Sequence, residues 1–163
     1  MNILRYSTIV LMCSMGPAFG ADPEIIPYDK LPEKVKEAVK AKYPDWKVVG
    51  VEKTVEDGET TFDVEFAVKG KTIEVTFTEE GMIEEIRKEI TLADLPKLVS
   101  AALSKKYPRA RHEEFWEVTE GEEVTYNIVL RIAQGRKKVD VTFDPKGTIV
   151  EEEITGAPMP KKK

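Results

Sequence analysis

The sequence predicts an α+β protein made of two tandem units, each with one helix packed on a four-stranded antiparallel meander sheet. Three observations lead to this prediction. A pattern of Leu-Pro, a helical stripe and Tyr-Pro occurs twice with a spacing of 64 residues, as from Leu31 to Leu95. Segments in which apolar and polar residues alternate follow each copy, and short turn signals with glycine separate these segments.

The helical part of each copy lies between two prolines. In the first copy, Leu31, Val35, Val39 and Tyr43 have the spacing of one helix face. The proline after the leucine suits a helix start, and the proline after the tyrosine ends the helix. We therefore expect an amphipathic helix in each copy.

The segments after each helix alternate with a period of two. In the first copy, Phe62, Val64 and Phe66 share one strand face, whereas Asp63 and Glu65 share the opposite face. This alternation is typical of an antiparallel sheet with one covered and one open face. We expect each helix to cover the apolar face of its own four strands.

The repeat also sets the expected domain boundaries. The first unit is expected at 28–91 and the second at 92–155. The joining segment is not rich in Gly, Ser or Pro, which indicates close packing of the two units rather than a flexible linker. The tail, residues 156–163, is basic, contains proline and is expected to be disordered.

Residues 1–20 have the pattern of a cleavable signal peptide. Arg5 precedes a short apolar run, and small residues at Ala18 and Gly20 match the cleavage rule. The run is too short to span a membrane as a helix. The sequence thus predicts a periplasmic or secreted protein cut after Gly20. The alternatives are a disordered or buried N-terminal segment, or a lipoprotein anchored through Cys13.

Composition argues against most kinds of catalytic chemistry. The chain has one histidine, His112, and one cysteine, so it lacks the usual parts of a catalytic triad or of a zinc site. It has no glycine-rich phosphate loop. A net charge of −5 disfavours nucleic acid as a partner. We predict no catalytic residue, no cofactor and no metal ligand, and a chain that is not an enzyme.

The outward strand positions differ between the two copies. Where the first copy has Glu52, Thr54 and Glu65, the second has Trp116, Val118 and Val129. Tryptophan and arginine are enriched as anchors of protein interfaces. The predicted partner-binding residues are Trp116, Val118, Val129 and Arg131. The alternative is a β-bulge after the second Tyr-Pro that buries Trp116 and exposes Phe115 instead.

The outward face of the first copy is rich in carboxylates, which can bind Ca²⁺. Neighbouring residues of a strand point to opposite faces, however, so adjacent acidic residues do not converge. Solvated charge that protects strand edges from aggregation is the simpler interpretation.

The paired signposts resemble the PepSY-like family, also described as β-lactamase-inhibitor-like. They are Leu31-Pro32, Tyr43-Pro44, Leu95-Pro96 and Tyr107-Pro108. The resemblance covers most of residues 28–155. It implies a small exported protein of the bacterial envelope with a curved sheet surface, a binding or inhibitory role, and no catalytic residues.

Two hypotheses about function follow. The first is an exported, non-enzymatic binding module, inhibitor-like toward a protein or peptidase, that contacts another protein or peptide of the cell envelope through its open sheet face. The alternative is an envelope protein that responds to a metal or small ligand through the acidic outward face of the first copy.

Overall fold

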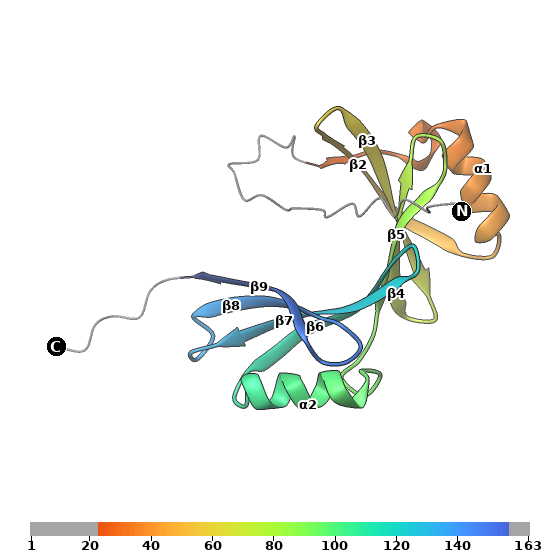
Figure 1. Cartoon of the computed structure of the whole chain (residues 1–163). Coiled ribbons are helices and arrows are strands. Elements are labelled where there is room, and N and C mark those ends of the chain that lie inside the picture. The colour runs from red at the N-terminus through yellow and green to blue at the C-terminus, as the bar shows by residue number, and fades with distance from the viewer. Residues whose placement is uncertain (1–22, 157–163) are drawn as a thin grey trace, which may run out of the picture.

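The computed structural model describes residues 23–156, which form one nine-stranded antiparallel sheet and two short α-helices (Figure 1). The strands lie in the sheet in the order in which they occur in the chain. The elements are β1 (Glu24–Ile25), a 3₁₀ turn (Tyr28–Lys30), α1 (Glu33–Lys42), β2 (Lys47–Glu56), β3 (Glu59–Val68), β4 (Lys71–Thr78), β5 (Ile83–Glu89), α2 (Lys97–Lys106), β6 (Arg111–Glu120), β7 (Glu123–Ile132), β8 (Lys137–Phe143) and β9 (Ile149–Gly156).

The prediction of two units, each a helix on its own four-stranded sheet, is wrong, because a single mainly β structure runs through the described chain. The last strand of the first half, β5, pairs with the first strand of the second half, β6, from Glu85–Glu120 to Glu89–Trp116. The pairing ends where the Ile90 N–H donates to the Phe115 carbonyl at 2.9 Å. A free strand edge exposes unpaired backbone groups. The pairing of β5 with β6 satisfies these groups on the two edges that meet.

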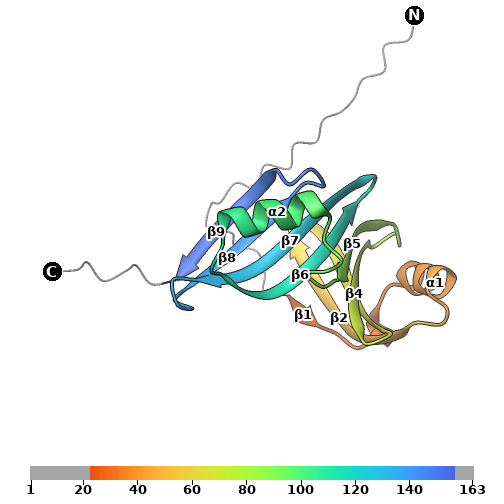
Figure 2. The same ribbon diagram turned by 90° about the horizontal axis from the view of Figure 1, so that it is seen from below.

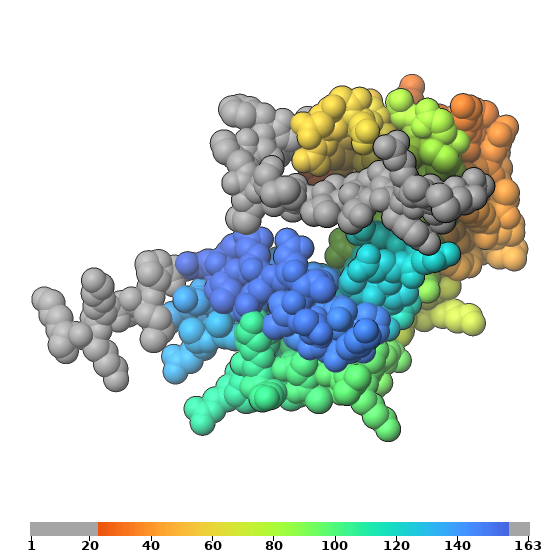
Figure 3. All heavy atoms as spheres, viewed as in Figure 1, coloured from red at the N-terminus to blue at the C-terminus, as the bar shows by residue number. Residues whose placement is uncertain are grey.

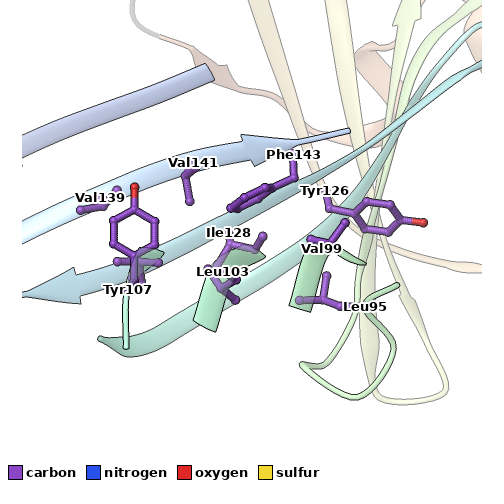
Figure 4. Close-up of a cluster of buried hydrophobic side chains, with 10 residues drawn as sticks. Leu95, Val99, Leu103, Tyr107, Tyr126, Ile128, Val139, Val141 and Phe143 are labelled. Carbon is purple, nitrogen blue, oxygen red and sulfur yellow. The ribbon is translucent and has the colours of Figure 1, made fainter. Parts of the chain in front are cut away.

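The two helices form where the proline-bounded stripes predict them. α1 begins directly after Pro32, and α2 directly after Pro96. Each helix buries its stripe against the strands that follow it. Figure 4 shows the α2 cluster, in which Val99 and Leu103 pack against strand residues such as Ile128. A separate cluster under α1 contains the equivalent helix residues and the apolar face of β3 and β4.

Both helices lie on the same face of the sheet, as the strand register shows. Ile86 of β5 packs in the α1 cluster and pairs with Thr119 of β6. Phe115, four residues from Thr119 and therefore on the same face, packs in the α2 cluster. Figure 1 shows α1 and α2 on the outside of a strongly curled sheet, and Figure 2 shows α2 lying across the second half. In the space-filling view of Figure 3, the orange α1 segment and the green α2 segment lie at the outer sides of the molecule.

The opposite side of the sheet, called the open face below, therefore has no helix over it within residues 23–156. Neither of the α-helices described within residues 23–156 has the length and apolar composition of a membrane span. The predicted signal peptide, with Cys13, and the tail after Gly156 lie outside the described residues.

Candidate functional site

The open face carries two neighbouring rows of side chains that cross five strands, from β2 to β6. The first row contains Glu52, Asp63, Thr76, Glu85 and Glu120, and the second contains Gly50, Glu65, Glu74, Arg87 and Val118. These ten positions hold six carboxylates and one basic group. Side chains of β2 to β5 line a hollow of about 540 Å³ on this face.

Like charges face each other directly across the strands of these rows. The three acidic cross-strand pairs are Glu52–Asp63, Glu65–Glu74 and Glu85–Glu120. Directly opposed like charges destabilise a sheet. The pairs therefore act against folding stability, which is the kind of local conflict that proteins retain at functional sites.

Arg87 is the one basic residue of the two rows. Its Nη1 lies 3.5 Å from a Glu74 carboxylate oxygen, and its Nε lies 3.8 Å from one of Glu85. The guanidinium carbon also lies 5.0 Å from the ring centroid of Trp116, close enough for a cation–π contact. A single guanidinium cannot neutralise the surrounding carboxylates, so the rows remain negative.

The pKa values of two of these carboxyls reflect this crowding. Burial raises the pKa of Glu85 to about 7, against the attraction of Arg87, and Glu120 adds to the rise through charge and a hydrogen bond. Burial also raises the pKa of Glu74, with smaller contributions from neighbouring carboxylates. Ionising these groups therefore has a free-energy cost, which the positive charge of a partner's side chain would partly offset.

The second half of the open face is less acidic. Here a neutral amide takes the place of a carboxylate. The Asn127 amide donates hydrogen bonds to the Asp140 carboxylate at 2.6 Å and to the Thr142 hydroxyl at 3.2 Å. In the first half, the corresponding contact is the hydroxyl of Thr76 donating to Asp63 at 2.6 Å. The second half of the open face keeps one directly opposed acidic pair, Asp140–Glu153, but it also holds the basic pair Arg131–Lys138. It is therefore less acidic than the first half.

The predicted partner-binding residues do not all come together. Trp116 lies half-buried on the open face, and its Nε1 donates to Glu114 at 3.3 Å. A bulge does occur in β6, between His112 and Glu114, yet Phe115 packs toward α2. Val118 and Val129 flank Trp116 but are only 8% and 5% exposed, so little of either is available to a partner.

Arg131 lies apart from Trp116, near the end of β7. Its Nε donates to both carboxylate oxygens of Glu113 at 3.0 Å, and Arg109 and Arg111 lie beside it around a shallow hollow. His112 lies on the helix side against Phe115, with ring centroids 5.5 Å apart. Its Nε2 finds no hydrogen-bond partner among the described residues.

Sequence reasoning missed Arg87 and Glu85. The available signal was the alternation of β5, in which Glu85 and Arg87 flank Ile86 and so share the outward face. The sequence could not show which residues lie beside them, because their neighbours Glu120 and Trp116 come from the second half of the chain. Among residues 23–156, no three His, Cys, Asp or Glu side chains converge as a metal site requires.

The fold and this face define a class of protein: one twisted antiparallel sheet, with both described helices on one side and an acidic face on the other. The model of the family described as "putative beta-lactamase-inhibitor-like, PepSY-like" matches residues 23–69 and 60–151. The chain therefore belongs to this family, and the resemblance seen in its paired Leu-Pro and Tyr-Pro signposts is confirmed.

Solved structures of distant sequence share the fold. A "putative periplasmic" protein of Bacteroides eggerthii is 20% identical, with a TM-score of 0.66 over 76% of this chain and 88% of its own. A DUF2874 family protein of Bacteroides uniformis is 19% identical, with a TM-score of 0.66 over 76% and 88%. A BLIP-like protein of Bacteroides fragilis is 16% identical, with a TM-score of 0.61 over 80% and 91%. No curated protein matches the sequence.

Proposed function

We propose that this chain is an exported, non-enzymatic binding protein whose open face receives a positively charged segment of a partner protein or peptide. The observation that carries the proposal is the set of three directly opposed carboxylate pairs in the two rows of the open face, which no helix covers within residues 23–156. Such pairs weaken the free protein, and a cationic partner would convert each repulsion into attraction.

Trp116 and Arg87 give this face a specific contact point. The tryptophan ring lies half-buried beneath the Arg87 guanidinium, at the boundary between the acidic first half and the more neutral second half. Tryptophan and arginine are the residues that most often dominate binding energy at protein interfaces. Trp116 is therefore the proposed anchor, and the nearly buried Val118 and Val129 occupy neighbouring positions of the same face.

The proposed function also includes export from the cytoplasm and an inhibitory role. The N-terminal pattern of residues 1–20 and the description of a structural relative as periplasmic both support export. The family description supports an inhibitor-like role toward an enzyme of the envelope. An enzyme captured by the chain should then lose activity in proportion to the amount of chain added.

The test compares two charge reversals on opposite faces. Glu65→Lys changes the open face, and Glu37→Lys makes the same change on the exposed side of α1. An envelope extract is passed over immobilised wild type and both variants, with Trp116→Ala as a fourth sample. We expect at least one partner that Glu37→Lys retains and that Glu65→Lys and Trp116→Ala lose. Equal recovery by all four proteins contradicts the proposal.

A further inference from the structure

The first edge of the sheet, at β1 and β2, differs from every internal strand pair because one side of it is free within the described residues. β1 pairs with β2 through Glu24–Lys53 and Ile25–Glu52, and the Ile26 N–H donates to the Val51 carbonyl at 3.0 Å. No described strand lies on its other side. Ile25, at this free edge, is 79% exposed, which is unusual for an isoleucine in a strand.

The second half of the chain shows what occupies the matching place there. Sixty-four residues later, Lys88–Glu117 and Glu89–Trp116 pair in the same way, and Ile90 donates to Phe115. Beyond that strand lies β4, which pairs with it through Ile73–Lys88 and Glu74–Arg87. In the second half, the position that is free at the first edge is therefore occupied by strand β4. The side chains of that strand alternate, with Ile73 on the helix side and Glu74 on the open face.

Two hollows meet at the free edge from opposite faces of the sheet. On the helix side, a hollow of about 560 Å³ is lined by apolar and aromatic residues such as Val39, Tyr43 and Trp46. The rings of Tyr43 and Trp46 stack there with centroids 4.4 Å apart. On the open face lies the acidic hollow of about 540 Å³ described above. Both hollows are lined by Ile25, Val49, Gly50 and Val51.

The free edge and the two hollows together fit an extended peptide strand. Successive side chains of an extended strand point to opposite faces. A strand added at this edge would therefore place every second side chain toward the apolar hollow and the others toward the acidic hollow, whose lining includes Glu52 and Glu65. Apolar side chains suit the first environment, and basic side chains suit the second. Strand addition to an exposed edge is a general mode of peptide recognition, in which such pockets supply specificity.

We propose that the β1–β2 edge binds an extended partner segment in which apolar and basic residues alternate, added to the sheet as a further strand. This inference rests on the proposed function, since it specifies the chemistry and position of the cationic segment. It places Val49 at the centre of the contact, because that side chain borders both hollows and is 48% exposed.

The probes are labelled synthetic peptides of about eight residues, a length within the range of natural strands. One alternates valine and lysine, a second has the same composition in two blocks, and a third alternates valine and glutamate. Binding to the full chain is measured by fluorescence anisotropy. We expect the alternating valine–lysine peptide to bind at least about tenfold more tightly than the block peptide, and the glutamate peptide not to bind. Equal affinity for the two lysine peptides, or no binding of either, overturns the inference.

Two variants with the same added charge locate the site. Val49→Lys changes the residue between the hollows, and Val55→Lys changes another exposed residue of β2 that lines neither hollow. We expect Val49→Lys to weaken the alternating peptide about tenfold and Val55→Lys to change it less than about twofold. Equal effects overturn the inference. Ile25→Lys provides a second edge variant if Val49→Lys melts at a lower temperature than wild type.

Failure of this inference can be distinguished from failure of the proposed function. If the peptides bind without preference for alternation but the open-face variants still lose their captured partner, the cationic segment binds the open face and not the edge. If the open-face variants capture every partner as well as wild type does, the proposed function itself fails.

Discussion

Glu85→Gln should stabilise the protein at pH 8 and have little effect at pH 4. The Glu85 carboxyl is crowded by Glu120 and Asp63, and burial is the largest cause of its pKa rising to about 7. A carboxyl with a raised pKa binds its proton more tightly in the folded state than in the unfolded chain. Its contribution to stability is therefore fully present below about pH 4.5 and is lost as the pH rises through 7.

The size of the effect follows from the pKa difference. A rise of about 2.5 pKa units corresponds to about 3.4 kcal/mol if it is fully expressed. The Glu85 side chain is 30% exposed, so solvent screens part of this interaction and about 1–2 kcal/mol is a realistic figure. Glutamine keeps the shape of the side chain and its capacity for hydrogen bonds but cannot ionise, so the variant should lack this loss of stability.

Urea unfolding at pH 4, 6 and 8 measures the effect, because the midpoint moves with stability when the slope is unchanged. Glu84→Gln is the control, since Glu84 is exposed and, as the extra residue between the Thr76–Glu85 and Phe77–Ile83 pairs, has no partner opposite it on β4. We expect the advantage of Glu85→Gln over wild type to grow with pH, and Glu84→Gln to show no comparable trend. An advantage that is the same at all three pH values would refute the electrostatic account of the open face.

Three further predictions concern packing and ligands. Gly147 has φ +83°, and a Cβ there would lie 2.6 Å from the Leu98 carbonyl oxygen of α2, whereas a Cβ at Gly70, with φ +81°, would meet nothing. In parallel urea titrations, Gly147→Ala should therefore lower the free energy of unfolding by about 1–3 kcal/mol more than Gly70→Ala does. Equal losses would count against the close contact between Gly147 and α2. Phe143→Ala removes a fully buried ring from the α2 cluster and should cost about 3–5 kcal/mol by the same method; a cost below about 1 kcal/mol would contradict the described core. Millimolar Ca²⁺ should leave the melting temperature unchanged, because no three carboxylates converge within residues 23–156, and a concentration-dependent rise would contradict this.

Helices and strand faces could be predicted from the sequence because each depends on the spacing of apolar residues within one segment. Proline-bounded stripes gave the helices, and strict alternation gave the buried and outward faces of the strands, so that Phe66 and Glu65 lie on the predicted sides. The joining of the two halves into one sheet could not be read in this way. A period of two specifies which face of β5 is buried but not which strand lies beside it.

The same limit applies to the candidate site. Trp116 stood out in the sequence by its residue type, and it does lie on the open face. Its contact with Arg87 depends on the pairing of β5 with β6, which no local pattern encodes. The two-residue strand β1 is also too short to give a periodic signal, and it is the element that leaves the first edge of the sheet free.

Site-specific photocrosslinking shows whether the open face contacts a cationic partner. A photoreactive phenylalanine derivative, which keeps an aromatic ring at the proposed anchor, replaces Trp116 in one variant. In a second variant it replaces Leu98, which is 60% exposed on α2 and so lies on the opposite side of the sheet. We expect a partner adduct from position 116 that weakens as salt rises, because screening reduces attraction to the carboxylates. We expect no such adduct from position 98. An adduct from position 98 alone, or one from position 116 that is indifferent to salt, would contradict an acidic open face that binds a cationic partner.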